Sequence, residues 1–167
     1  MADPVRVRWN EADEEWDSER SEKGAFECYY REMSMALNPE PNVPVRAGKV
    51  PPARPFEVDL VRIPPGAKLC PRHAHSTQWE YYIVLSGRGQ LLQAPGDPPI
   101  PMQPGDHLMQ PPGWVHTVEN DGEEDLLYYV VANNPVEDVV NYPDSGKWLA
   151  ARHVFRMVEA DYFDGEE

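Results

Sequence analysis

The sequence is poor in cysteine and in long apolar runs, and each shortage argues against a class of protein. Only Cys28 and Cys70 occur among 167 residues, so a disulfide-stabilised secreted domain is not expected and a reducing compartment is the simpler interpretation. The first residues lack a basic segment followed by an apolar one, which predicts no secretory signal and a cytoplasmic location. No segment approaches the about 20 apolar residues that span a bilayer, so no membrane association is expected.

Positive charge is also scarce. The chain has 15 Lys and Arg residues against 29 Asp and Glu residues, which gives a formal net charge of −14. At that charge the protein repels phosphate backbones and anionic lipid headgroups at long range. Nucleic acids and membranes are therefore not expected as partners, whereas a small-molecule substrate is.

Proline, in contrast, is abundant. The 19 prolines gather between apolar segments, and proline interrupts both helix interiors and central strands. From Phe56 to Ala132 short apolar or alternating runs are separated by turns rich in Pro, Gly, Asn and Asp. Seven or eight short strands at nearly regular spacing predict an all-β sandwich or barrel.

The length is that of one domain with terminal arms. We expect an N-terminal arm and linker over residues 1–55, a barrel over residues 56–132, and a C-terminal arm over residues 133–167 that packs on the barrel. Between Ala25 and Leu37 the apolar residues fall near helical spacing, which is compatible with one short helix in the N-terminal arm.

Two histidines and a glutamate form the first candidate site. His73 and His75 are two residues apart, so on a strand their side chains point to the same face. Glu80 opens the next apolar run after a bend, and His116 follows a second turn. Three neutral nitrogens and one carboxylate suit a first-row divalent metal, and they leave open positions for water, substrate or oxygen. A closed structural zinc site more often uses cysteine.

The spacing of these residues resembles the two motifs of the cupin family, over roughly residues 57–132. The first motif reads Gly66, His73, His75, Glu80 and Gly87, and the second reads Gly105, Pro111, Gly113, His116 and Asn120. Six residues rather than the usual five separate Gly66 from His73, which indicates a bulge or a different equivalent glycine. The resemblance implies a double-stranded β-helix jelly-roll barrel with Fe, Mn, Zn or Ni bound by His73, His75, Glu80 and His116.

Side chains on the same faces as these ligands are candidates for a substrate pocket. Tyr82 shares the face of Glu80, and Asn120 shares that of His116. Trp114 precedes the His116 strand and is a candidate to close the mouth of the pocket, with packing against an arm as an equal alternative. For Tyr82, filling the barrel interior is an equal alternative. An apolar stripe faces the other way and predicts a homodimer interface; it comprises Trp79, Tyr81, Ile83 and Leu85.

Three functions fit these residues. The first is a metal-dependent enzyme on a small molecule, with a sugar or sugar phosphate isomerase as the leading hypothesis from the resemblance. In that reaction Glu80, the only carboxylate in the motifs, is the candidate catalytic base. A phosphate would need basic partners, for which the candidates are Lys68, Arg72 and Arg88. The second is an Fe- or Mn-dependent dioxygenase, and the third is a non-catalytic small-molecule-binding cupin.

Overall fold

The computed structural model describes residues 15–33, 56–135, 137–151, 153–160 and 162. Within these residues the chain forms strands and no helical element. The strands are β1 (Asp17–Arg20), β2 (Glu27–Glu32), β3 (Phe56–Ile63), β4 (Ala74–His75), β5 (Glu80–Ser86), β6 (Gly89–Leu92), β7 (Ile100–Met102), β8 (His107–Gln110), β9 (Thr117–Glu119), β10 (Leu126–Asn133), β11 (Val139–Tyr142), β12 (Lys147–Ala150) and β13 (His153–Phe155).

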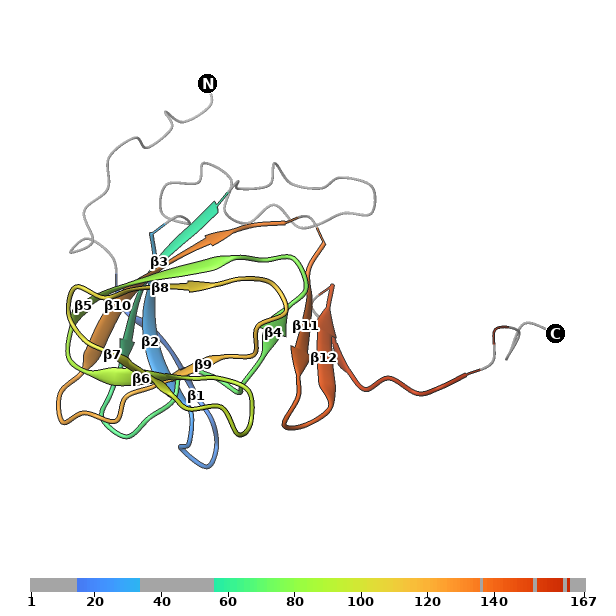
Figure 1. The fold of residues 1–167 in the computed structure, drawn as a ribbon, viewed down its shortest axis with the longest axis horizontal. Coiled ribbons are helices and arrows are strands. Elements are labelled where there is room, and N and C mark those ends of the chain that lie inside the picture. Colours follow the sequence, from blue (N-terminus) through green and yellow to red (C-terminus); the bar gives the residue numbers. More distant parts are fainter. Residues whose placement is uncertain (1–14, 34–55, 136, 152, 161, 163–167) are drawn as a thin grey trace, which may run out of the picture.

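The described strands form three sheets (Figure 1). The largest has the order β1-β2-β3-β10-β5-β8, the second β13-β12-β11-β4, and the third β7-β6-β9. Every pairing within them is antiparallel, and half of the neighbouring pairs join strands that are not consecutive in the chain, as in a jelly roll. The sheets are separate in their hydrogen bonding and are not closed into one barrel. The all-β jelly-roll architecture expected from the sequence is confirmed.

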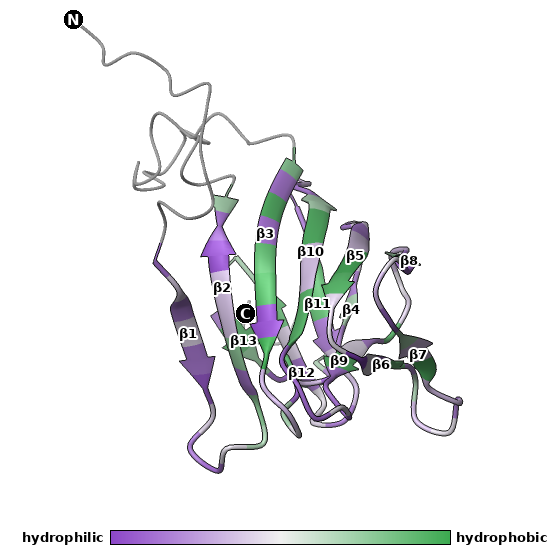
Figure 2. Ribbon diagram, turned by 90° about the vertical axis from the view of Figure 1, so that its left-hand side faces the viewer, coloured by the Kyte–Doolittle hydropathy of each residue, from purple (hydrophilic) through white to green (hydrophobic). Residues whose placement is uncertain are grey.

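A single apolar core lies between the six-stranded sheet and the small β7-β6-β9 sheet. Alternation along the strands produces it: in β5, Tyr82 and Val84 are buried, whereas their neighbours Tyr81 and Ile83 are less buried. Figure 2 shows the hydrophobic residues concentrated on β3, β5 and β10, with a hydrophilic β1 at the sheet edge. The buried cluster comprises Cys28, Val61, Ile63, Ala67, Tyr82, Val84, Leu91, Met102, Val118, Leu126 and Tyr128. Each large side chain in it contributes about 1.5–3 kcal/mol by burial.

The short helix expected over residues 25–37 is wrong where the structure describes that segment. Residues 27–32 form strand β2, which pairs with β1 and β3. Cys28 is buried and Tyr30 packs on the core, while Tyr29 stacks under the Arg62 guanidinium on the other face. The open edge of β3 accepts these residues as a strand, and this pairing outweighs a weak helical spacing. Residues 34–37 lie outside the described residues.

The segments expected as arms add strands to the sheets. β1 and β2 extend the large sheet beyond β3, and β11 pairs with β4 through Val140↔His75 and Asn141↔Ala74. The C-terminal segment therefore lies directly beside one of the candidate histidines. Among the described residues none forms a helix long and apolar enough to cross a membrane.

Candidate metal centre

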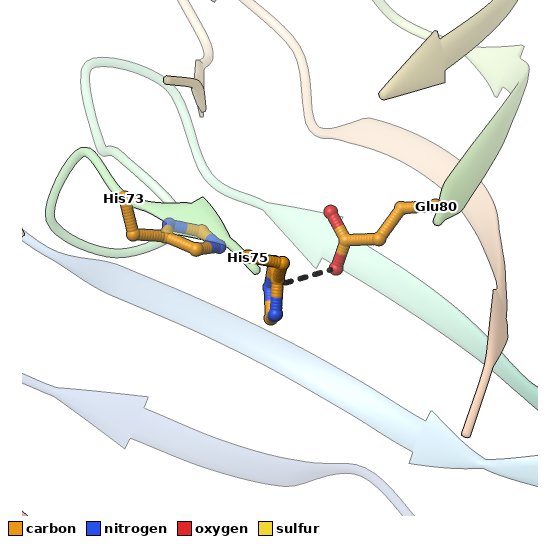
Figure 3. Close-up of side chains that lie close together, drawn as sticks. All are labelled: His73, His75 and Glu80. Carbon is orange, nitrogen blue, oxygen red and sulfur yellow. Dashed lines mark ion pairs between the residues drawn. The ribbon is translucent and has the colours of Figure 1, made fainter. Parts of the chain in front are cut away.

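The backbone places the four predicted ligands side by side. His73 and His116 form an antiparallel bridge, with hydrogen bonds of 3.0 Å from His73 N to His116 O and 2.8 Å from His116 N to His73 O. Their ring centroids are 4.6 Å apart, and those of His73 and His75 are 5.0 Å apart. Glu80 opens β5 and points its carboxylate at His75 (Figure 3).

His73, His75 and Glu80 form a compact donor group. One ligand atom from each lies within 4.8 Å of the other two. His116 joins the group through Glu80, because its Nε2 lies 2.8 Å from Glu80 Oε2. The Nε2 of His75 lies 3.7 Å from the other carboxylate oxygen, Oε1. The structure thus brings together all four residues that the sequence selected.

Each histidine has its Nδ1 beside an oxygen acceptor. The Nδ1 of His73 lies 3.0 Å from Pro71 O, and that of His116 lies 3.0 Å from Trp114 O. The Nδ1 of His75 lies 2.5 Å from Asp138 Oδ2. With the proton on Nδ1, the lone pair is on Nε2, which is the arrangement found in metal-ligating histidines with an outer hydrogen-bond partner.

Burial and neighbouring charges keep His73 and Glu80 in their metal-binding protonation states. Burial, together with the neighbouring His116, lowers the pKa of His73 to about 4. Burial alone would raise the pKa of Glu80, but the hydrogen bond and charge of His116, with the charge of His75, lower it to about 2. At neutral pH His73 is therefore neutral and Glu80 ionised, as metal ligands must be.

The donor chemistry fits a divalent first-row cation. With its proton on Nδ1, His116 would present a lone pair to an anionic carboxylate oxygen 2.8 Å away. Two acceptors at that distance repel unless a proton or a cation lies between them. Imidazole nitrogens and a carboxylate are the donors that Fe, Mn, Zn and Ni share. The residues that would hold the ion are His73, His75, Glu80 and His116.

The remaining predicted site residues have different positions. Tyr82 is 1% exposed and donates a hydrogen bond of 2.7 Å to Glu80 Oε2, so it both fills the core and orients a ligand. The Trp114 side chain is exposed, and the contact with His116 is made by the Trp114 carbonyl. Asn120 is fully buried and its amide bonds the backbone of Ile63 and of residues 122 and 124, so the structure does not bring it to the cluster.

The comparisons with known proteins agree with this geometry. Residues 59–132 match the family model described as the cupin domain. These residues are a cupin domain. The resemblance inferred from the two motifs is therefore confirmed for the part of the chain that carries all four candidate ligands.

Proteins similar to the chain include sugar phosphate isomerases. It is 39% identical over 62 residues to a glucose-6-phosphate isomerase of Pyrococcus horikoshii, covering 35% of this chain and 33% of that protein; the chain thus spans about a third of the length of its curated relatives. A candidate sugar phosphate isomerase of Acidithiobacillus ferrooxidans has the same fold, with a TM-score of 0.69, 22% identity and coverage of 89% and 92%. A sugar phosphate isomerase of the cupin superfamily from Silicibacter pomeroyi has a TM-score of 0.61, 25% identity and coverage of 80% and 82%.

One residue at the centre lies outside the cupin domain and was not expected from the sequence. Asp138 precedes β11, and its carboxylate contacts His75, which is 63 positions earlier. Burial alone would raise the pKa of Asp138, but hydrogen bonds from His75 and from the Thr77 backbone lower it to about 2. No local motif marks Asp138, because only the pairing of β11 with β4 brings it to His75.

A basic cavity adjoins the cupin histidines. It has a volume of about 280 Å³, and its charged lining consists of three basic side chains, Lys68, Arg72 and Lys147, and one acidic side chain, Asp144. Its lining includes Pro71, whose carbonyl oxygen lies 3.0 Å from His73 Nδ1, and Thr117, which follows His116 in sequence. Arg72 pairs with Asp144 at 3.3 Å, and Lys68 pairs with Glu119 at 3.5 Å.

Proposed function

We propose that this protein is a metal-dependent isomerase of a small hydroxy-carbonyl compound, with sugar phosphates as the substrate class. The observation that carries the proposal is the convergence of His73, His75 and Glu80 within 4.8 Å, with His116 Nε2 at 2.8 Å from Glu80 Oε2. When bound there, a divalent ion supplies Lewis acidity toward the carbonyl and hydroxyl oxygens of a substrate. The similarity to glucose-6-phosphate isomerases over 62 residues supports this reaction class over others.

The basic cavity supports a phosphorylated substrate. In a chain with a net charge of −14, an anionic ligand needs a local concentration of positive charge. Lys68 and Arg72, two of the three basic residues selected from the sequence, line this cavity together with Lys147. The third, Arg88, is not among the lining residues. The cavity lining includes Pro71, whose carbonyl oxygen lies 3.0 Å from His73 Nδ1, and this proximity supports a phosphate site near the candidate metal centre.

Glu80 has two possible parts in such a reaction. As the catalytic base it would take a proton from the hydroxyl-bearing carbon beside the carbonyl and return it to the carbonyl carbon, while the hydroxyl proton passes to the former carbonyl oxygen. A pKa of about 2 makes a weak base, however, and it favours a ligand role for the carboxylate. Turnover in deuterated water separates the two, because a proton carried by Glu80 exchanges with solvent and product would gain deuterium. A hydrogen that passes directly between the carbons would not exchange.

The proposal is tested with protein freed of metal by chelation and reloaded with Fe²⁺, Mn²⁺, Zn²⁺ or Ni²⁺ in separate samples. We expect aldose and ketose phosphates to interconvert, as monitored by NMR. No oxygen should be consumed during the reaction. Oxygen uptake on a substrate panel would instead assign a dioxygenase. Ligand binding without turnover under every metal would assign a non-catalytic binding cupin.

A further inference from the structure

His75 differs from the other two histidines in what orients it. His73 and His116 are each held by the carbonyl of the residue two positions earlier, so local backbone geometry fixes both rings. The Nδ1 of His75 lies 2.5 Å from a carboxylate oxygen of Asp138, which lies beyond the cupin domain. One predicted ligand therefore depends on a residue that the cupin domain does not contain.

The second oxygen of Asp138 holds the loop that joins two predicted ligands. Residues 76–79 connect His75 to Glu80. Oδ1 accepts hydrogen bonds from the backbone of Thr77 at 2.9 Å and of Gln78 at 3.3 Å. It also accepts from the hydroxyl of Ser76 at 3.1 Å, while the Thr77 hydroxyl donates to Glu137 O at 2.6 Å. One carboxylate thus contacts the His75 ring and the loop that sets its distance from Glu80.

The residues around Asp138 reinforce this contact. Ser76 N donates to Val139 O at 2.9 Å, and Val139 N donates to Ser76 Oγ at 2.8 Å. At the other end of the loop, Trp79 N donates to Asn133 Oδ1 at 2.6 Å. The side chain of Asp138 is only 18% exposed, and its bonds to His75 and to Gln78 N are partly buried. The loop is therefore bonded at both ends, by Asn133 at the end of β10 and by the segment between β10 and β11.

We propose that Asp138 is a positioning residue for metal binding, which aims Nε2 of His75 at the ion and sets the spacing between His75 and Glu80. The inference rests on the proposed metal site, but not on the proposed isomerase reaction. A histidine whose second nitrogen bonds a carboxylate has a fixed tautomer and a more basic ligating nitrogen. Loss of such an outer partner typically costs about 10–100-fold in metal affinity.

The test compares Asp138→Asn with Asp125→Asn. The amide introduced by Asp138→Asn would keep one acceptor for His75, but its NH₂ group would face the N–H groups of the loop. Asp125 is a matched control, since it also bonds a side chain, Arg62 at 2.9 Å, but has no contact with the cluster. Zn²⁺ affinity is measured on the full chain by competition with a chromophoric chelator. We expect a 10–100-fold loss for Asp138→Asn and less than about a twofold change for Asp125→Asn.

A second measurement separates positioning from general destabilisation. The ring nitrogens of His75 in the metal-free protein report its tautomer by ¹⁵N NMR. The Nδ1–H form should dominate in the wild type and in Asp125→Asn, and it should be lost in Asp138→Ala. Equal Zn²⁺ affinity for wild type and Asp138→Asn, or an unchanged tautomer in Asp138→Ala, would overturn the inference. Absence of Zn²⁺ binding by the wild type would overturn the metal site itself, and isomerase activity does not enter either result.

Discussion

The three motif histidines converge because each imidazole has one nitrogen committed to an acceptor. Pro71 and Trp114 supply carbonyl oxygens to His73 and His116, and a carboxylate serves His75. The Nε2 atoms are then left for the centre of the site, where Glu80 lies. Residues that do not themselves bind the ion thus determine which nitrogen of each imidazole is free to ligate it.

Replacement of His116 by Ala should abolish tight metal binding while the protein remains folded. His116 is 2% exposed, and its Nε2 lies 2.8 Å from Glu80 Oε2. Its loss removes a ligand, so the affinity for Zn²⁺ should fall by more than about 100-fold. Loss of a hydrogen-bond partner of a ligand costs up to about that much. Metal content after dialysis and far-ultraviolet circular dichroism measure binding and fold.

The matched control for this variant is His107→Ala. His107 is an exposed histidine on β8 whose ring bonds the Tyr81 hydroxyl at 2.8 Å. Its removal should leave metal content unchanged. If His116→Ala and His107→Ala retained the same affinity as wild type, His116 would not be a ligand.

The metal-free protein should lose stability as the pH falls from about 6.5 toward 4. Burial and the neighbouring His116 lower the folded-state pKa of His73 to about 4, so the unfolded state binds a proton first. The contribution of His73 to the free energy of unfolding is complete above its unfolded-state pKa of about 6.5. Below that pH it declines, by up to about 3 kcal/mol. Glu80 and Asp138, whose pKa values are lowered to about 2, act in the same direction but at lower pH.

Urea unfolding of chelator-treated protein at about pH 7 and about pH 4.5 measures this loss, since the carboxylates titrate mainly below that window. His73→Gln carries no titrating group at the position, and its stability should depend less on pH. Identical pH dependence in wild type and His73→Gln would show that His73 does not control it.

At the level of elements, the turn between β5 and β6 depends on a glycine for two separate reasons. Gly87 has a φ of +77°, and a Cβ added there would lie 2.3 Å from Asp125 O and 2.8 Å from Leu126 Cα. Gly66, the other glycine of the first motif, has a φ of +76° with no atom within 4 Å of a Cβ. The two positions therefore share the conformational requirement, but only Gly87 also faces a neighbouring backbone.

Gly87→Ala should destabilise the protein more than Gly66→Ala does. Both variants incur about 1–2 kcal/mol for a left-handed non-glycine residue. Gly87→Ala must also shift the chain at Asp125, which adds about 1–3 kcal/mol of overpacking. Chemical denaturation gives both free energies of unfolding. Equal losses would mean that the loop before β10 yields without cost.

At the scale of the whole molecule, the strongly negative charge and the local basic cavity oppose each other. A net charge of −14 weakens anion binding over most of the surface. Lys147 is far along the chain from Lys68 and Arg72, and it meets them in the lining of one cavity. The homodimer expected from the outer face of β5 stays a prediction. Trp79 and Leu85 on that face are 48% and 40% exposed. Analytical ultracentrifugation would measure the oligomeric state.

Replacement of Arg72 by Gln should weaken binding of a sugar-alcohol phosphate by about tenfold or more, because a charge-assisted hydrogen bond is lost. Binding of the unphosphorylated sugar alcohol should be unaffected. Arg62→Gln is a matched control, since Arg62 is equally exposed and also pairs with an aspartate. Calorimetric titration compares the variants. Equal losses for both sugar alcohols, or none for either, would place the phosphate elsewhere.

The sequence alone determined the fold class and the four candidate ligands. Alternation along a strand fixes which side chains share a face over a few residues, so His73 with His75, and Glu80 with Tyr82, follow from spacing. Glycine and proline mark the turns that bring two such strands back together. These relations are local, and tertiary contacts in the described residues did not alter them.

Only the tertiary structure decided the features that depend on which strands pair. Residues 27–32 form a strand because β3 offers them an edge, whereas their spacing alone suggested a helix. Asp138 contacts His75, and Lys147 joins Lys68 and Arg72, because β11 and β12 pack beside β4. Contacts between residues as far apart as His75 and Asp138 leave no periodic trace in one sequence, since each partner is constrained by a neighbour in space rather than along the chain.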